Sequence, residues 1–138
     1  MQVLCSAGVE CEFPDLRPLL NDVKGLIRSI DGNVRVRDLL VETRLSPSQE
    51  AFNGWAHPEI FSVRRSRFRS HDSGWIQMSL GVECSERDII RLFAHEMRHI
   101  SQFNRGRKRY GTLTINPMTV IDSEDDAYDF ELRVLDLM

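Results

Sequence analysis

The chain has 138 residues, of which 41% are hydrophobic, and its formal net charge is -3. This length supplies one ordinary hydrophobic core and leaves little room for a second, so we expect a single domain spanning residues 1–138. The near balance of acidic and basic residues argues against a general polyanion binder. No stretch approaches the roughly 18 consecutive apolar residues of a membrane helix.

The N-terminus lacks the basic start and long apolar stretch of a secretory signal, so we expect a cytoplasmic protein. Three cysteines are present, Cys5, Cys11 and Cys84. Their odd number and the absence of metal-type spacing predict reduced thiols rather than a disulfide framework.

The first half of the chain reads as one helix followed by strands. Apolar residues recur at helical spacing from Leu16 to Ile30, until Asp31-Gly32 ends the pattern. Short alternating stretches at 34–36 and 60–68 predict strands, and Ser46-Pro47 and Asn53-Gly54 read as turns. The stretch Trp75 to Val82 predicts one more strand.

The second half reads as two helices. Ser85, with an acidic residue three positions later, predicts a capped helix start. Apolar residues then repeat from Ile89 to Phe103, and Asn104 to Gly106 indicate the end. After a polar connection over 107–117, a last helix is expected from Thr119 or Asp122 to the C-terminus. The order of elements, a helix, three or four strands and two helices, indicates an α+β fold.

The middle of the first of these two helices carries the sequence His95-Glu96-Met97-Arg98-His99. Four residues are slightly more than one helical turn, so both imidazoles project from one face and can bind one cation together. Glu96, one residue past the first histidine, reaches a water on the metal without being a ligand. Two surface histidines are the alternative, but the helix cap, the apolar core face and the preceding strand favour a catalytic Zn²⁺ site.

Two histidines and a water do not complete a tetrahedral zinc site, so a third protein ligand is expected. Glu124 is favoured, because on a helix it shares a face with Val120, Ala127 and Val134 and a carboxylate placed there needs a partner. The alternatives that remain are Asp125, Asp126, His57 and His71.

These residues resemble a known family. The motif His95 to His99, followed by Glu124-Asp-Asp-Ala127, is similar to the zincin metallopeptidases of the gluzincin type, over roughly Gly74 to the C-terminus. The resemblance implies a minimal zincin-like catalytic domain that hydrolyses peptide bonds. One Zn²⁺ would be held by His95, His99 and Glu124, and Glu96 would act as general base on a zinc-activated water.

The resemblance also implies supporting roles. Many gluzincins have an aspartate or asparagine four residues after the ligand glutamate, where this chain has Tyr128, which leaves Asp129 as a substitute. The strand Trp75 to Val82 would be the sheet edge that pairs with substrate. Apart from the resemblance, Gln102 lies on the same face as His99 and could contact substrate or orient a ligand, but a solvated helix residue is the favoured interpretation. The candidate oxyanion donors are Tyr110, Tyr128, His57 and His71.

Two other functions compete with a peptidase. Basic residues crowd 64–69 and 105–109, which suggests a nucleic-acid-associated protease, but the segment 110–138, with seven acidic residues and one basic, offers an internal partner. A zincin-fold module that binds zinc or regulates without turnover is the other alternative. We expect a monomer that acts on a peptide or protein substrate and has no membrane partner.

Overall fold

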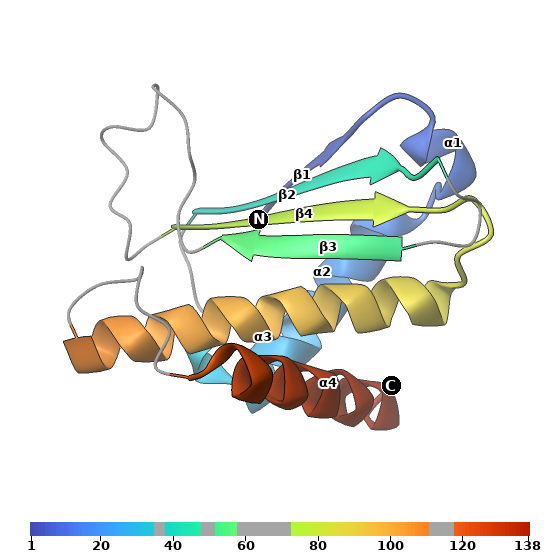
Figure 1. Cartoon of the computed structure of the whole chain (residues 1–138). Coiled ribbons are helices and arrows are strands. Elements are labelled where there is room, and N and C mark those ends of the chain that lie inside the picture. Colours follow the sequence, from blue (N-terminus) through green and yellow to red (C-terminus); the bar gives the residue numbers. More distant parts are fainter. Residues whose placement is uncertain (35–37, 48–51, 58–72, 111–117) are drawn as a thin grey trace, which may run out of the picture.

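The computed structural model describes residues 1–34, 38–47, 52–57, 73–110 and 118–138, with the backbone alone at 38, 52, 53, 55, 57, 73 and 106–110. The elements in chain order are β1 (Gln2–Cys5), α1 (Val9–Glu12), α2 (Leu16–Ile30), the short 3-10 helix η1 (Gly32–Val34), β2 (Asp38–Leu45), β3 (Phe52–His57), β4 (Ser73–Leu80), α3 (Glu86–Tyr110) and α4 (Val120–Asp136). This is an α+β arrangement in which α3 lies between the sheet and α4 (Figure 1).

The four strands form one mixed sheet in the order β1-β2-β4-β3. β1, β2 and β4 run parallel, because α1 and α2 carry the chain back between β1 and β2, whereas β3 is antiparallel to β4. Alternate side chains of β2 and β4 face the helices. Val41, Ile76 and Met78 are buried there against α2 and α3.

The core joins this sheet face to α2 and α3. Leu20 and Ile27 of α2 and Phe93, Met97 and Ile100 of α3 are fully buried in it. The apolar residues that recur at helical spacing in both helices therefore form their core faces. No helix in the described part of the chain is both long enough and apolar enough to cross a lipid bilayer.

Both predicted helix starts are confirmed by side-chain caps. The Ser85 hydroxyl accepts from the Asp88 N–H at 3.1 Å, and the Asp88 carboxylate accepts from the Ser85 N–H at 3.0 Å. Thr119 caps α4 by accepting from the Asp122 N–H at 3.1 Å. These bonds satisfy backbone donors that have no partner within a helix, and so fix where α3 and α4 begin.

The predicted end of α3 at Asn104 to Gly106 is wrong, since the helix continues to Tyr110. Tertiary contacts explain the extension. The buried Asn104 side chain donates to the Asn33 carbonyl, and Arg105 lies 3.9 Å from the Asp31 carboxylate. These contacts hold Asn104, which in isolation would favour the end of a helix, and its neighbour Arg105 within α3.

The strands were predicted least well. Asn53-Gly54, read as a turn, lies inside β3, and the strand expected from Trp75 ends at Leu80. Gly54 is explained by close packing, because a Cβ there would come within 3.0 Å of Leu92 and 3.1 Å of Glu96 on α3. β4 lies between β2 and β3, so its expected role as the sheet edge is also wrong. The edge beside α3 is β3. The strand predicted at 60–68 lies outside the described residues, and Val34 of the strand at 34–36 belongs to η1.

Candidate metal centre

His95 and His99 lie one turn apart in the middle of α3 and face α4. Their Nε2 atoms are 3.2 Å apart. Glu124, from the first half of α4, brings one carboxylate oxygen to 3.0 Å from His95 Nε2 and the other to 2.8 Å from His99 Nε2. Donor atoms on a tetrahedron around zinc lie about 3.3 Å from one another. The three predicted ligands are therefore brought together at a spacing that fits a zinc ion, and among the described residues they form a group suited to hold a metal.

A buried carboxylate supports His95 from behind. Glu131 Oε2 lies 3.1 Å from His95 Nδ1, and the Glu131 side chain is 5% exposed. Its other oxygen accepts from Arg91 Nε at 2.9 Å and Nη2 at 2.7 Å. A carboxylate that accepts from a guanidinium in this way is an acceptor toward His95 as well, so it accepts a hydrogen bond from the protonated Nδ1 of His95. His95 then presents Nε2 as an acceptor.

A buried amide does the same for His99. Gln102 is fully buried, and its Oε1 lies 2.8 Å from His99 Nδ1. The orientation of this amide is set on its other side, where Nε2 donates to the Ser123 carbonyl at 2.8 Å and to Asp126 at 3.0 Å. An amide oxygen can only accept, so His99 also carries its proton on Nδ1 and presents Nε2 as an acceptor.

The two supports together make the centre electron-rich. Two imidazole nitrogens and two carboxylate oxygens point at one another, and in the neutral tautomers none of these atoms brings a hydrogen. Such a group requires a proton or a cation between the acceptors. In the metal-free protein, burial opposes protonation of His95, but its bond to Glu131 and the charges of Glu96 and Glu124 raise its pKa. A divalent cation contacts all the acceptors at once, which a single proton does not.

Glu96 lies beside this group, between α3 and β3. It is buried, and its Cγ approaches the place where a side chain on Gly54 would begin, at 3.1 Å. Burial raises the pKa of Glu96 to about 7; the positive charge of His95 opposes this rise, while Glu124 and Glu131 add to it. A carboxyl group with a pKa near neutrality exchanges its proton readily at physiological pH.

The remaining candidates for the third ligand are placed elsewhere. Asp125 is exposed and does not face the histidines, and Asp126 is bound by Arg98 through Nε at 2.7 Å and Nη2 at 3.1 Å. The His57 side chain and all of His71 lie outside the described residues. Glu124 is itself less buried than expected, with 44% of its side chain exposed, and Val120, which was expected on the same apolar face of α4, is 80% exposed.

Of the two tyrosines proposed as oxyanion donors, Tyr128 has a described side chain and Tyr110 does not. The Tyr128 ring packs edge-on against the His95 imidazole, with the ring centres 4.7 Å apart. Tyr110 is the last residue of α3 rather than part of a connection, and its side chain lies outside the described residues. Tyr128 thus adjoins the metal centre.

Two predicted supporting roles need correction. Asp129 is exposed, so it does not replace the aspartate that many gluzincins have after their ligand glutamate. Glu131 supports the histidine instead, seven residues after Glu124 and therefore on the same face of α4. That spacing was a usable signal in the sequence. Gln102 orients His99 rather than lying in solvent.

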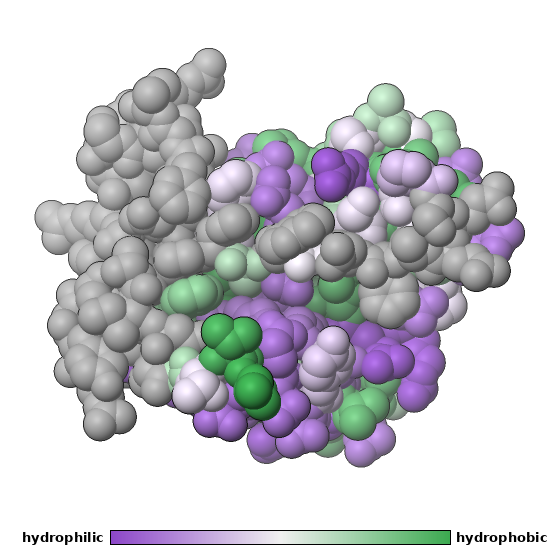
Figure 2. All heavy atoms as spheres, viewed as in Figure 1, coloured by the Kyte–Doolittle hydropathy of each residue, from purple (hydrophilic) through white to green (hydrophobic). Residues whose placement is uncertain are grey.

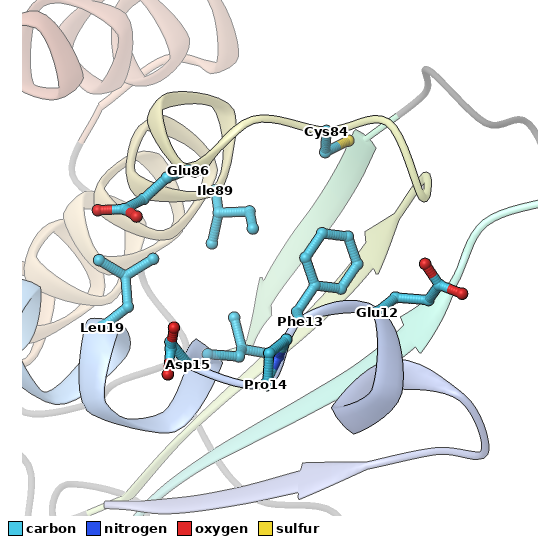
Figure 3. Close-up of a pocket in the computed structure, with 9 residues that line it drawn as sticks. Glu12, Phe13, Pro14, Asp15, Leu19, Cys84, Glu86 and Ile89 are labelled. Carbon is cyan, nitrogen blue, oxygen red and sulfur yellow. The ribbon is translucent and has the colours of Figure 1, made fainter.

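A pocket of about 170 Å³ opens at the other end of α3, away from the histidines. Figure 3 shows that Phe13 and Leu19 approach Ile89 there, with Cys84 above them and the carboxylates of Glu12, Asp15 and Glu86 around them. Burial raises the pKa of Cys84 and so favours its thiol form. The pocket combines apolar walls with an acidic rim and contains no imidazole.

The basic segments can be followed only in part. Residues 64–69 and the side chains of 107–109 lie outside the described residues, and Arg105 lies near Asp31. Comparison with protein-family models, with curated proteins and with solved structures gives no match for this chain.

Proposed function

We propose that this chain is a zinc-dependent peptidase whose metal is bound by His95, His99 and Glu124. One observation carries the proposal. Both imidazoles place their Nδ1 atoms against fixed acceptors, and their Nε2 atoms, 3.2 Å apart, lie 3.0 and 2.8 Å from the two oxygens of the Glu124 carboxylate. Acceptor atoms that converge in this way need a cation, and imidazole and carboxylate ligands suit zinc. When bound, zinc would act as a Lewis acid that activates water and polarises a carbonyl group.

Glu96 is the proposed general base. It follows the first ligand histidine, is buried, and has a pKa of about 7 in the metal-free protein. Its carboxylate would accept a proton from the attacking water and deliver it to the leaving amine. Tyr128, beside His95, is the proposed donor to the developing oxyanion.

An extended substrate has a backbone partner close to Glu96. β3 is the end strand of the sheet and, among the described strands, pairs with β4 alone. Gly54 of this strand packs closely against α3, where a Cβ would come within 3.1 Å of Glu96 Cγ, so the strand passes directly beside the proposed base. We infer that a peptide pairs with β3 and presents its scissile bond to the centre.

The decisive experiment compares the wild type with Glu96→Gln and with Glu83→Gln, a control that removes an exposed carboxylate from the turn before α3. Zinc content is measured by mass spectrometry, and turnover is measured on an unstructured polypeptide such as casein. We expect one zinc per chain in all three proteins. Turnover should be lost with chelator, restored by zinc, and lowered about 10²- to 10⁴-fold in Glu96→Gln.

Three outcomes would contradict the proposed peptidase. Equal cleavage by Glu96→Gln, or cleavage that survives chelation, would reject the mechanism. Stoichiometric zinc without cleavage of any polypeptide would favour a zinc-binding module instead.

A further inference from the structure

α4 exposes an apolar stripe directly beside the metal centre. Ile121, Tyr128 and Leu132 are 74%, 53% and 49% exposed. They are spaced by seven and four residues, so they share one face of the helix. Tyr128 lies one turn after Glu124 and packs on His95, so the apolar stripe adjoins the proposed metal ligands. Figure 2 shows hydrophobic atoms open to solvent over the start of α4.

The next face of α4, farther from the histidines, is acidic. Its four exposed carboxylates recur three, four and seven residues apart, which aligns them along the helix: Asp122, Asp125, Asp129 and Asp136. The other acids of α4 are engaged elsewhere, since Glu124 faces the histidines, Asp126 binds Arg98 and Glu131 binds Arg91. Arg133 is the one basic side chain of this helix. We call these four residues the acidic stripe.

We propose that α4 selects the substrate, and that the preferred substrate is a polypeptide segment with a bulky apolar side chain beside the cleaved bond and lysine or arginine two or three residues away. This inference rests on the proposed peptidase function. An apolar side chain of the substrate would cover the part of this stripe beside Tyr128, which removes apolar surface from water on both sides.

Charge and dimensions fix the second part of the preference. An extended peptide advances about 3.3 Å per residue, and neighbouring faces of a helix about 10 Å wide lie several ångströms apart. A substrate that crosses from the apolar stripe to the acidic stripe therefore reaches the carboxylates within two or three residues. Basic side chains suit that position, and acidic ones are repelled.

The test separates binding from turnover. Four fluorescein-labelled peptides carry Leu or Ser at the centre, and Lys or Glu at the third position on both sides. Their affinities for zinc-loaded Glu96→Gln are measured by fluorescence anisotropy. We expect the Leu/Lys peptide to bind most tightly. Replacing Leu by Ser should weaken binding about fivefold, and replacing Lys by Glu should weaken it about tenfold at low salt.

Surface variants in the same background assign each preference to its stripe. Asp125→Asn/Asp129→Asn should remove most of the preference for Lys and keep the preference for Leu. Ile121→Ser/Leu132→Ser should do the reverse. The matched control Asp15→Asn/Asp22→Asn removes two exposed carboxylates at the start of and within α2 and should change neither preference.

Equal binding of the four peptides would overturn the inference, as would a preference for Lys that survives Asp125→Asn/Asp129→Asn. The wild type is then assayed for cleavage of the same peptides. Binding with the expected preferences but without cleavage would support the role of α4 and reject the peptidase. Cleavage without either preference would support the peptidase and reject the role of α4.

Discussion

The contact between α3 and α4 contains two charged clusters that differ in one respect. In the metal centre, His95 and His99 meet Glu124 with acceptor atoms on every side. One residue before His99, Arg98 forms the second cluster by donating to Asp126 and, at 2.7 Å, to Asp31 at the end of α2. The Arg98 cluster thus places one cation between two carboxylates, whereas the ion-pair partners of Glu124 among the described residues are the two imidazoles and include no arginine or lysine.

The pKa values follow this difference. Burial opposes ionisation of Asp31, but the nearby Ser101 hydroxyl, the Asn33 N–H and Arg98 outweigh it and lower its pKa. The bond from Arg98 lowers the pKa of Asp126 as well. The pKa of Glu96, beside the metal centre, is raised instead. The Arg98 cluster is electrostatically complete and holds α2, α3 and α4 together, while the proposed metal centre would be completed by a bound cation.

The largest expected effect is the loss of zinc from His99→Ala. Removing one of three protein ligands should weaken zinc binding about a thousandfold, as measured by competition with a chelating indicator. Without metal, the variant should be less stable than the wild type by about 1 kcal/mol at most, because the imidazole that is removed faced other hydrogen-bond acceptors. Arg98→Met is the matched control from the second cluster and should still bind one zinc per chain. Unchanged affinity in His99→Ala would place the metal elsewhere.

Arg98→Met should instead destabilise the metal-free protein. The Asp31 side chain is 4% exposed, and without Arg98 its charge would be buried with little compensation. Removing one partner of a buried pair costs about 3 to 5 kcal/mol. Urea unfolding of the metal-free wild type, Arg98→Met and His99→Ala measures this. A smaller loss of stability in Arg98→Met than in His99→Ala would contradict the division of roles.

Local signals made much of this architecture predictable. The caps at Ser85 and Thr119 and the apolar spacing of α2 and α3 placed three helices, because these patterns involve residues close in sequence. The position of β3 was not predictable in this way. Gly54 reads as a turn residue in isolation, and its role in the strand depends on Leu92 and Glu96 packing against it from a distant helix.

The residues of the candidate site can be divided in the same way, into those that local patterns predict and those that depend on tertiary packing. The ligands His95, His99 and Glu124 follow from helical periodicity within two segments. Their supports do not. Glu131 was overlooked because its role depends on how α4 lies against α3, and Arg91 because its partner is 40 residues away. The substrate edge was assigned to the wrong strand, since strand order is set by pairings that no local pattern encodes.

Replacing Glu131, which accepts from His95, should have a moderate effect on zinc affinity. In Glu131→Gln the amide can accept from only one of its present partners, His95 or Arg91, through its oxygen. Zinc affinity should fall about 10- to 100-fold, as for other residues that orient metal ligands. Asp129→Asn is the matched control, since it neutralises an exposed acid two residues earlier on α4. Equal zinc affinities of the two variants would show that Glu131 does not support the metal ligands.

The smallest effect is a difference in pH dependence between the wild type and Glu96→Gln, both freed of metal by chelator. The Glu96 pKa rises from 4.5 to about 7 on folding, so between these values the folded protein holds a proton that the unfolded chain has released. The stabilisation associated with this proton is complete below pH 4.5 and is lost as the pH rises to 7. A shift of this size corresponds to about 3 kcal/mol. Glu96→Gln cannot release a proton, so its stability should decline less than that of the wild type over this interval in chemical unfolding.

Bound zinc should reduce the decline in the wild type, because its charge offsets the carboxylates around Glu96. The same decline in both metal-free proteins would mean that Glu96 ionises as freely as an exposed side chain, and the contrast between the two clusters would then not extend to this residue.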